Sequence, residues 1–259
     1  MGNETVLICE DTLDRVFTGI YDAYRLKKDN SIESHDLIHL AVNEPFSQKL
    51  FTDYISIETS LEKSEKVSRK LKKSLGSVTY YNLCLAASSV FEDKADAVYH
   101  TVVLGLREHD ANVLDRLCDS YVQSAFKCFR AANNEVCHYI EFIRFSELDN
   151  GILYAKINSR HHILPFIMPH FADRLPANDF VIYDEGTQAF GLHPGFKNWY
   201  LVQGMDFDED SLMYSQAEKE YRELFKRFCG SISIEERKNE KLQQSVLPLR
   251  FRPNMTEFN

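Results

Sequence analysis

The sequence predicts an α+β fold with a mixed or antiparallel sheet, a central helical insertion and C-terminal helices. Strand-like apolar runs occur near the N-terminus and again after residue 140. Between about residues 59 and 137 the chain has no proline and only two glycines, Gly76 and Gly105, and its apolar residues recur at helical spacing. Because the first strand can join the later sheet, we expect a single α+β domain, residues 1–259, with a mainly helical insertion at about 59–137.

The N-terminal elements follow from short apolar runs. Residues 5–9 and 35–42 are predicted strands, and 51–57 is a weaker strand candidate. Between the first two, apolar residues at helical spacing predict a helix to about Lys27, with Asp11 or Thr12 as its N-cap.

The central region divides into three or four helices. The breaks are expected near Gly76, residues 92–93 and residues 108–110. The last of these helices carries a continuous apolar stripe from Val113 to Ala125.

The C-terminal half begins with a hairpin. Strands at 142–147 and 152–157 flank Asn150-Gly151, which is the strongest short hairpin signal. The remaining elements are a helix at 164–174 that Pro169 should kink, strands at 180–183, 188–192 and 199–202, a helix that Gly230 should end, and a final helix at 234–246.

Composition excludes several classes of protein. Hydrophobic content of 44% and charged content of 27% are typical of a globular protein, and no apolar run approaches the ~20 residues of a membrane span. The N-terminus lacks a signal-peptide pattern, so we expect a cytoplasmic protein with no membrane contact. The six cysteines show no C-x-x-C pair, which favours buried reduced thiols and predicts neither a metal site nor a cofactor.

A local basic segment stands out on an acidic chain. The net charge of −9 argues against a nonspecific duplex binder, whose affinity rests on many phosphate contacts. Within 61–73, however, four cations share one predicted helix face: Lys66, Arg69, Lys70 and Lys73. This basic ridge can bind phosphates or an acidic partner, or it can be an ordinary solvated helix face.

Five blocks in order carry a resemblance to a known family. They are Ile8–Tyr24, Glu135–Phe145, His161–Leu175, Val181–Asp184 and Leu247–Phe258. The chain resembles a bacterial family of DNA metabolism and DNA repair proteins, classed as a domain of unknown function. It departs from the family pattern at Cys9, where an aromatic residue is expected, at Asp11, where glycine is expected, and at Tyr183, where histidine is common.

The resemblance implies a role in DNA modification or repair, but it identifies no catalytic residues. The family resembles a companion of a radical-S-adenosylmethionine protein of DNA modification or repair, and related domains are fused to uracil-DNA-glycosylase-like proteins. The implied partners are that radical-S-adenosylmethionine protein and single-stranded or damaged DNA. The chain itself lacks the three closely spaced cysteines of a radical enzyme.

Four polar residues in the resembling blocks are candidates for catalysis. Glu135 and His138 share a helix face, and His170 and Asp184 lie in two further blocks. Together they can form a general acid/base or metal group, or a buried polar network with a structural role. The pair His161-His162 is not expected to hold one metal, because adjacent side chains diverge.

The C-terminal tail is expected to fold onto the protein. Its large apolar residues would expose too much area if the segment were free. In an extended conformation Arg250 and Arg252 would point outward, toward a carboxylate or phosphate, while Phe251 points into the body. Alternatively, the tail covers the core and its arginines form surface ion pairs.

Three functional hypotheses follow. The first is an accessory protein of bacterial DNA repair or modification that binds nucleic acid or the radical-S-adenosylmethionine partner. The second is an enzyme acting on nucleic acid or a nucleotide through the Glu135, His138, His170 and Asp184 group. The third is a scaffold that binds only protein.

Overall fold

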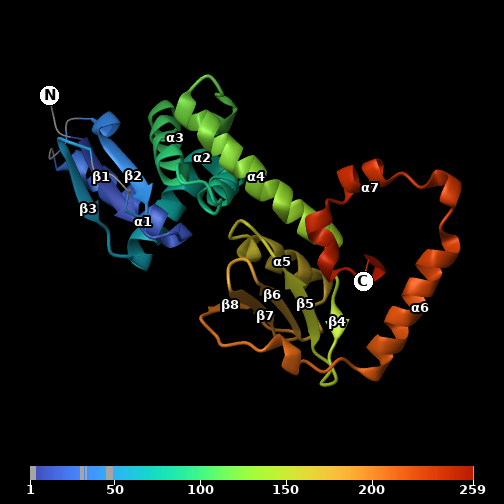
Figure 1. Ribbon diagram of the computed structural model, residues 1–259. Helices are drawn as coiled ribbons and strands as arrows, with labels where there is room; N and C mark the ends of the chain where they lie inside the picture. The colour runs from blue at the N-terminus through green and yellow to red at the C-terminus, as the bar shows by residue number, and fades with distance from the viewer. Residues whose placement is uncertain (1–3, 30–31, 33, 45–48, 259) are drawn as a thin grey trace. The chain divides into compact units, whose positions relative to one another are not determined.

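The computed structural model describes residues 4–29, 32, 34–44 and 49–258. The chain forms two compact units, with the boundary between Asn133 and Asn134. Each unit has its own sheet (Figure 1). The predicted α+β fold is confirmed. The single-domain boundary with an insertion at about 59–137 stays a prediction.

The first unit contains a three-stranded parallel sheet. Its order is β2-β1-β3, formed by β1 (Glu4–Cys9), β2 (Ile38–Val42) and β3 (Thr52–Ser56). The expectation that the first strand joins the later sheet is therefore wrong. The crossover through α1 (Leu13–Lys28) instead places β1 beside β2, its neighbour in sequence.

Helix α1 begins and packs as its sequence dictates. The Thr12 side chain caps it by accepting a hydrogen bond from the Arg15 N–H. Gly19 lets the helix approach the sheet closely, because a Cβ at this position would collide with Cys9 Sγ. Val16, Phe17 and Ile20 are buried in the resulting core.

Three helices follow, and their breaks lie close to those that the sequence predicts. The expected start of the last helix near Val113 is wrong, because Val113–Asp115 form a separate 3-10 turn and the helix begins at Ser120. Helix α2 (Leu61–Ala87) is interrupted at Gly76, whose φ of +84° is unfavourable for other residues. Helix α3 (Lys94–Glu108) ends at His109 in the left-handed region. Helix α4 (Ser120–Phe142) continues from the first unit into the second.

The second unit is built on a mixed five-stranded sheet. Its order is β4-β5-β6-β7-β8, and only β5 and β6 pair in parallel, through the crossover helix α5 (Leu164–Arg174). The strands are β4 (Ser146–Glu147), β5 (Leu153–Ile157), β6 (Phe180–Asp184), β7 (Ala189–His193) and β8 (Tyr200–Gln203). The predicted hairpin at Asn150-Gly151 is confirmed, since Glu147 pairs with Leu153.

Two predicted boundaries in this unit are wrong. Residues 142–147 do not form one strand, because α4 runs to Phe142 and only Ser146–Glu147 pair with β5. Gly230 does not end its helix: α6 spans Gln216–Ile232, since a glycine inside a helix costs only about 1 kcal/mol. The final helix, α7, is shorter than predicted and spans Glu240–Val246.

Within the described part of the chain, no helix combines the length and the apolar character that crossing a bilayer requires.

Candidate nucleic-acid interface

A cleft in the second unit collects basic side chains. It has a volume of about 170 Å³ and is lined by four cations but only one carboxylate, that of Glu209. The cations are Arg144, Lys156, Arg222 and Lys226. This lining makes the hollow a candidate site for an anion on a chain whose net charge is −9.

The cations come from β5, from α6 and from the segment between α4 and β4, where Arg144 lies. Lys156 lies on β5, two residues after Tyr154, so both side chains leave the same face of the sheet. Arg222 and Lys226 are four residues apart on α6 and therefore share one helix face. The C-terminal tail supplies the remaining wall with Asn254 and Thr256.

Most of the cleft cations have carboxylate partners. Arg144 Nη2 lies 3.0 Å from Glu257 Oε1, and Arg222 Nε donates to Glu218 Oε1 at 2.6 Å. Lys226 has no ion pair among the residues that the structure describes. Both pairs are only partly buried, so a phosphate that enters the cleft can compete with Glu257 and Glu218 for the same donors.

Lys156 is the most enclosed of the four cations. Its Nζ donates to Glu209 Oε2 at 2.6 Å and lies 3.1 Å from Glu185 Oε1. Burial lowers the pKa of this ammonium, but the hydrogen bonds and charges of the two carboxylates outweigh it and raise the pKa above its usual value. Lys156 therefore remains charged at neutral pH.

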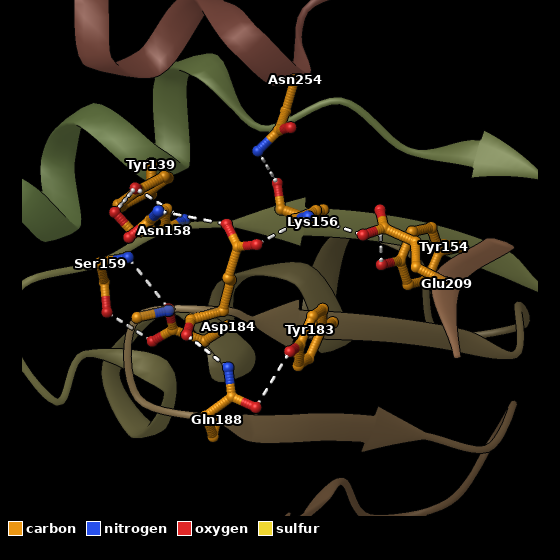
Figure 2. Close-up of polar contacts among 12 residues, drawn as sticks. Tyr139, Tyr154, Lys156, Asn158, Ser159, Tyr183, Asp184, Gln188, Glu209 and Asn254 are labelled. Atoms are coloured by element: carbon orange, nitrogen blue, oxygen red, sulfur yellow. Dashed lines mark hydrogen bonds and ion pairs between the residues drawn. The ribbon is translucent and has the colours of Figure 1, made fainter. Parts of the chain in front are cut away.

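A hydrogen-bond network fixes the backbone beside Lys156 (Figure 2). Tyr139 Oη donates to the Asn158 carbonyl at 2.6 Å and accepts from the Asn158 N–H at 3.1 Å. Asn254 Nδ2 donates to the Lys156 carbonyl at 3.0 Å, which ties the tail to β5. The cleft wall is thus held by α4 just after the end of β5 and by the C-terminal tail at Lys156.

Two of the predicted catalytic residues hold one loop. Asp184 is completely buried and accepts hydrogen bonds from the N–H of Ser159 at 3.0 Å and of Gly186 at 3.1 Å. Its other oxygen accepts a hydrogen bond from the Ser159 hydroxyl group (Figure 2) and another from the Thr187 hydroxyl group. The carboxylate therefore binds the loop that follows β5.

Glu135 holds the same loop from α4. Its carboxylate accepts from the Arg160 N–H and, at 2.9 Å, from the His161 N–H, and it pairs with Arg250 Nη1 at 2.9 Å. Both acidic candidates thus meet at residues 158–161. Main-chain N–H groups, two hydroxyl groups and the Arg250 guanidinium occupy their acceptor sites, which favours the structural interpretation of a buried polar network.

The two predicted histidines lie elsewhere in this unit. His138 stacks on Phe251 with ring centroids 5.0 Å apart, and its buried Nδ1 has no hydrogen-bond partner. His170 is exposed on α5 and contacts Phe171 edge-on. Among the described residues, no hydrogen bond or ring contact joins either histidine to Asp184, so the shared four-residue site stays a prediction.

The tail is folded, but its predicted extended conformation is wrong. Leu249–Asn254 form 3-10 turns, in which Phe251 and Met255 are buried while Leu249 remains exposed. This turn lets Arg250 reach buried Glu135 while Phe251 enters between His138 and Tyr139. Arg252 donates to the Leu247 carbonyl and stacks over Phe258, so both arginines contact their own unit.

The basic ridge lies on α2 of the first unit, as predicted. Lys66, Arg69, Lys70 and Lys73 are all exposed, and the apolar stripe of Val67, Leu71 and Leu75 is buried beneath them. Within the described part of the chain, Lys66 is the one of the four with a short ion pair, 2.6 Å from Glu62. Its role in binding stays a prediction.

Sequence reasoning missed the cleft itself. The four-residue spacing of Arg222 and Lys226 indicates that both lie on one face of a helix, and this is the one local signal of the cleft. Arg144 and Lys156 approach only because the hairpin returns β5 beside β4, which no local pattern records.

A family model described as a domain of unknown function, DUF4130, matches residues 92–257. The chain belongs to this family. The DUF4130 match includes all four cleft cations, Glu135, Asp184 and nearly all of the tail. No curated protein matches the chain. The family assignment confirms that the chain carries a domain of unknown function, and its description names no reaction.

Proposed function

We propose that this protein is an accessory protein of bacterial DNA repair or DNA modification that binds single-stranded nucleic acid through the cleft of the second unit. The observation that supports this proposal is the lining of the cleft. Four cations and one carboxylate surround it, although the chain as a whole is acidic. Phosphate contacts supply most of the sequence-independent affinity for nucleic acid.

The size of the cleft favours a polymer over a free nucleotide. Small-molecule sites usually occupy about 300–1,000 Å³. The cleft volume of about 170 Å³ is smaller and admits a phosphate group with little else. A strand that passes over the opening and inserts one phosphate fits these dimensions.

The enzymatic alternative has less support. A general acid or base must be able to exchange a proton with a substrate. Glu135 and Asp184 instead accept hydrogen bonds from the loop at residues 158–161, and Glu135 is paired with Arg250. We therefore assign these two carboxylates to the architecture of the cleft.

A second candidate function, binding of a protein partner, is favoured by α6. Four large apolar residues on this helix are more than half exposed: Tyr221, Leu224, Phe228 and Ile232. They lie three or four residues apart and so form one stripe, and stripes of this kind usually mark a protein interface. The radical-S-adenosylmethionine protein of the resemblance is the partner that we propose for it.

The nucleic-acid proposal is tested by fluorescence anisotropy with a labelled single-stranded oligonucleotide over a salt series. A triple variant, Arg144→Gln, Arg222→Gln and Lys226→Gln, should bind more weakly, and its salt slope should fall by about 0.7 per lost phosphate contact. The matched control changes three exposed lysines outside the cleft to glutamine: Lys197, Lys219 and Lys241. Equal affinity and slope in the triple variant and the control would contradict the proposal.

The basic ridge is tested in the same assay. Changing Lys66, Arg69, Lys70 and Lys73 together to glutamine should also reduce affinity and flatten the salt dependence if the ridge binds the strand. Wild-type affinity and slope in this variant would restrict binding to the second unit. If the wild type binds no DNA, the nucleic-acid proposal is wrong, and the hypothesis of a scaffold that binds only protein is favoured instead.

A further inference from the structure

Three side chains that could bind a metal ion lie close together in the first unit, although one of them is far from the other two in sequence. His39 lies on β2, and Asp96 and His100 lie one turn apart on α3. One ligand atom from each lies within 4.8 Å of the others. No local pattern indicates this cluster, because His39 is 57 residues away from Asp96.

The separations suit a bound metal ion. His39 Nδ1 lies 3.1 Å from Asp96 Oδ2, and His100 Nε2 lies 3.4 Å from Asp96 Oδ1. Around a tetrahedral zinc ion with bonds of about 2.1 Å, neighbouring ligand atoms are about 3.4 Å apart. The three atoms can therefore share one ion with only small side-chain movements.

His100 provides the deciding observation. Its side chain is only 7% exposed, and its Nε2 is buried with no hydrogen-bond partner, although it faces the Asp96 carboxylate. A buried polar atom without a partner is rare and costs about 1–3 kcal/mol. A ligand bound between the three side chains would satisfy it.

The surroundings hold the ligands in place. The Leu40 N–H donates to Asp96 Oδ1 at 3.1 Å and orients the carboxylate. Tyr121 stacks on the His100 ring at 4.0 Å and fixes its plane. Outer contacts of this kind are typical of metal sites, where they set the orientation of the ligands.

We propose that His39, Asp96 and His100 bind a divalent first-row transition metal ion. Two imidazoles and one carboxylate form the ligand set of catalytic zinc sites and of non-haem iron(II) sites. Three protein ligands leave at least one coordination position for water or a substrate group. The site is independent of the nucleic-acid cleft, which uses other residues in the second unit.

The test uses the full-length chain after treatment with a chelator. Cobalt(II) is added at neutral pH, and its visible absorption and the bound equivalents after dialysis are measured; zinc(II) is then added in competition. The wild type should bind one equivalent, and zinc should displace the cobalt. Loss of an outer contact alone reduces metal affinity about 10–100-fold, so Asp96→Asn and His39→Gln should each lose about 100-fold or more.

His109→Asn is the matched control, because His109 is an exposed histidine in the same unit and asparagine tolerates its left-handed conformation. It should bind cobalt like the wild type. His39 is partly exposed, so His39→Gln remains informative if a change at Asp96 impairs folding, which circular dichroism reports. Failure of the wild type to bind cobalt, or equal binding by His39→Gln and His109→Asn, would overturn the proposal.

Discussion

The two units use one carboxylate each in different ways: Asp184 is fully buried, whereas Asp96 is partly exposed. In the second unit, Asp184 accepts hydrogen bonds from two main-chain N–H groups and two hydroxyl groups. In the first unit, Asp96 accepts one main-chain N–H and faces two imidazoles, one of which has an unpartnered nitrogen. The comparison indicates that a carboxylate saturated by its own backbone supports the fold, whereas one that faces unsatisfied side chains is available to a ligand.

The largest expected effect comes from Asp184→Asn. Its amide nitrogen is a donor and would face donors, so at least one buried group would lose its partner. We expect a loss of about 2–3 kcal/mol in the free energy of unfolding. Urea denaturation followed by fluorescence measures it in the second unit, because the only tryptophan is Trp199. A loss below about 0.5 kcal/mol would show that the network is not structural.

Removal of the tail contact should have a smaller effect. Arg250→Ala takes one partner from buried Glu135 but leaves its main-chain donors, so we expect a loss of about 1–2 kcal/mol. Arg252→Ala is the control, since this guanidinium contacts only a carbonyl and a ring in the tail itself. Equal urea midpoints for the two variants would mean that the Glu135–Arg250 pair contributes no stability.

Asp96→Asn should change stability still less in the absence of metal. The remaining carbonyl oxygen can accept the Leu40 N–H, so we expect a loss of less than about 1 kcal/mol in chelator-treated protein. Urea denaturation followed by far-UV circular dichroism checks this. A loss as large as that of Asp184→Asn would remove the contrast between the two carboxylates.

His138→Phe should have the smallest effect. His138 Nδ1 is buried without a hydrogen-bond partner, as His100 Nε2 is. Its ring, however, stacks on Phe142 and Phe251, and no ion pair joins it to a carboxylate among the described residues. Phenylalanine retains the stacking and removes the unsatisfied atom, so the urea midpoint should be unchanged or slightly higher. A clear loss of stability would reveal a polar contact made by this imidazole in solution.

Sequence reasoning located most elements but not the sites. Apolar periodicity and the Asn150-Gly151 turn were sufficient for the hairpin, α5 and the helical region, because these signals are local. The sequence identifies Glu135 and Asp184 as candidate site residues. That both bind the loop at residues 158–161 depends on the pairing of β5 with β6, which the sequence does not show. The cluster of His39, Asp96 and His100 requires β2 and α3 to come together, and no local spacing predicts that contact.

The most direct test of the contrast between the two carboxylates is a thermal unfolding experiment with and without zinc(II), using the wild type, Asp96→Asn and Asp184→Asn. A ligand at 100 times its Kd stabilises the folded state by about 2.7 kcal/mol. We predict that zinc raises the Tm of the wild type and of Asp184→Asn by the same amount and leaves that of Asp96→Asn unchanged. The same rise in all three proteins, or no rise in any, would contradict the assignment of Asp96 as a ligand and Asp184 as a structural group.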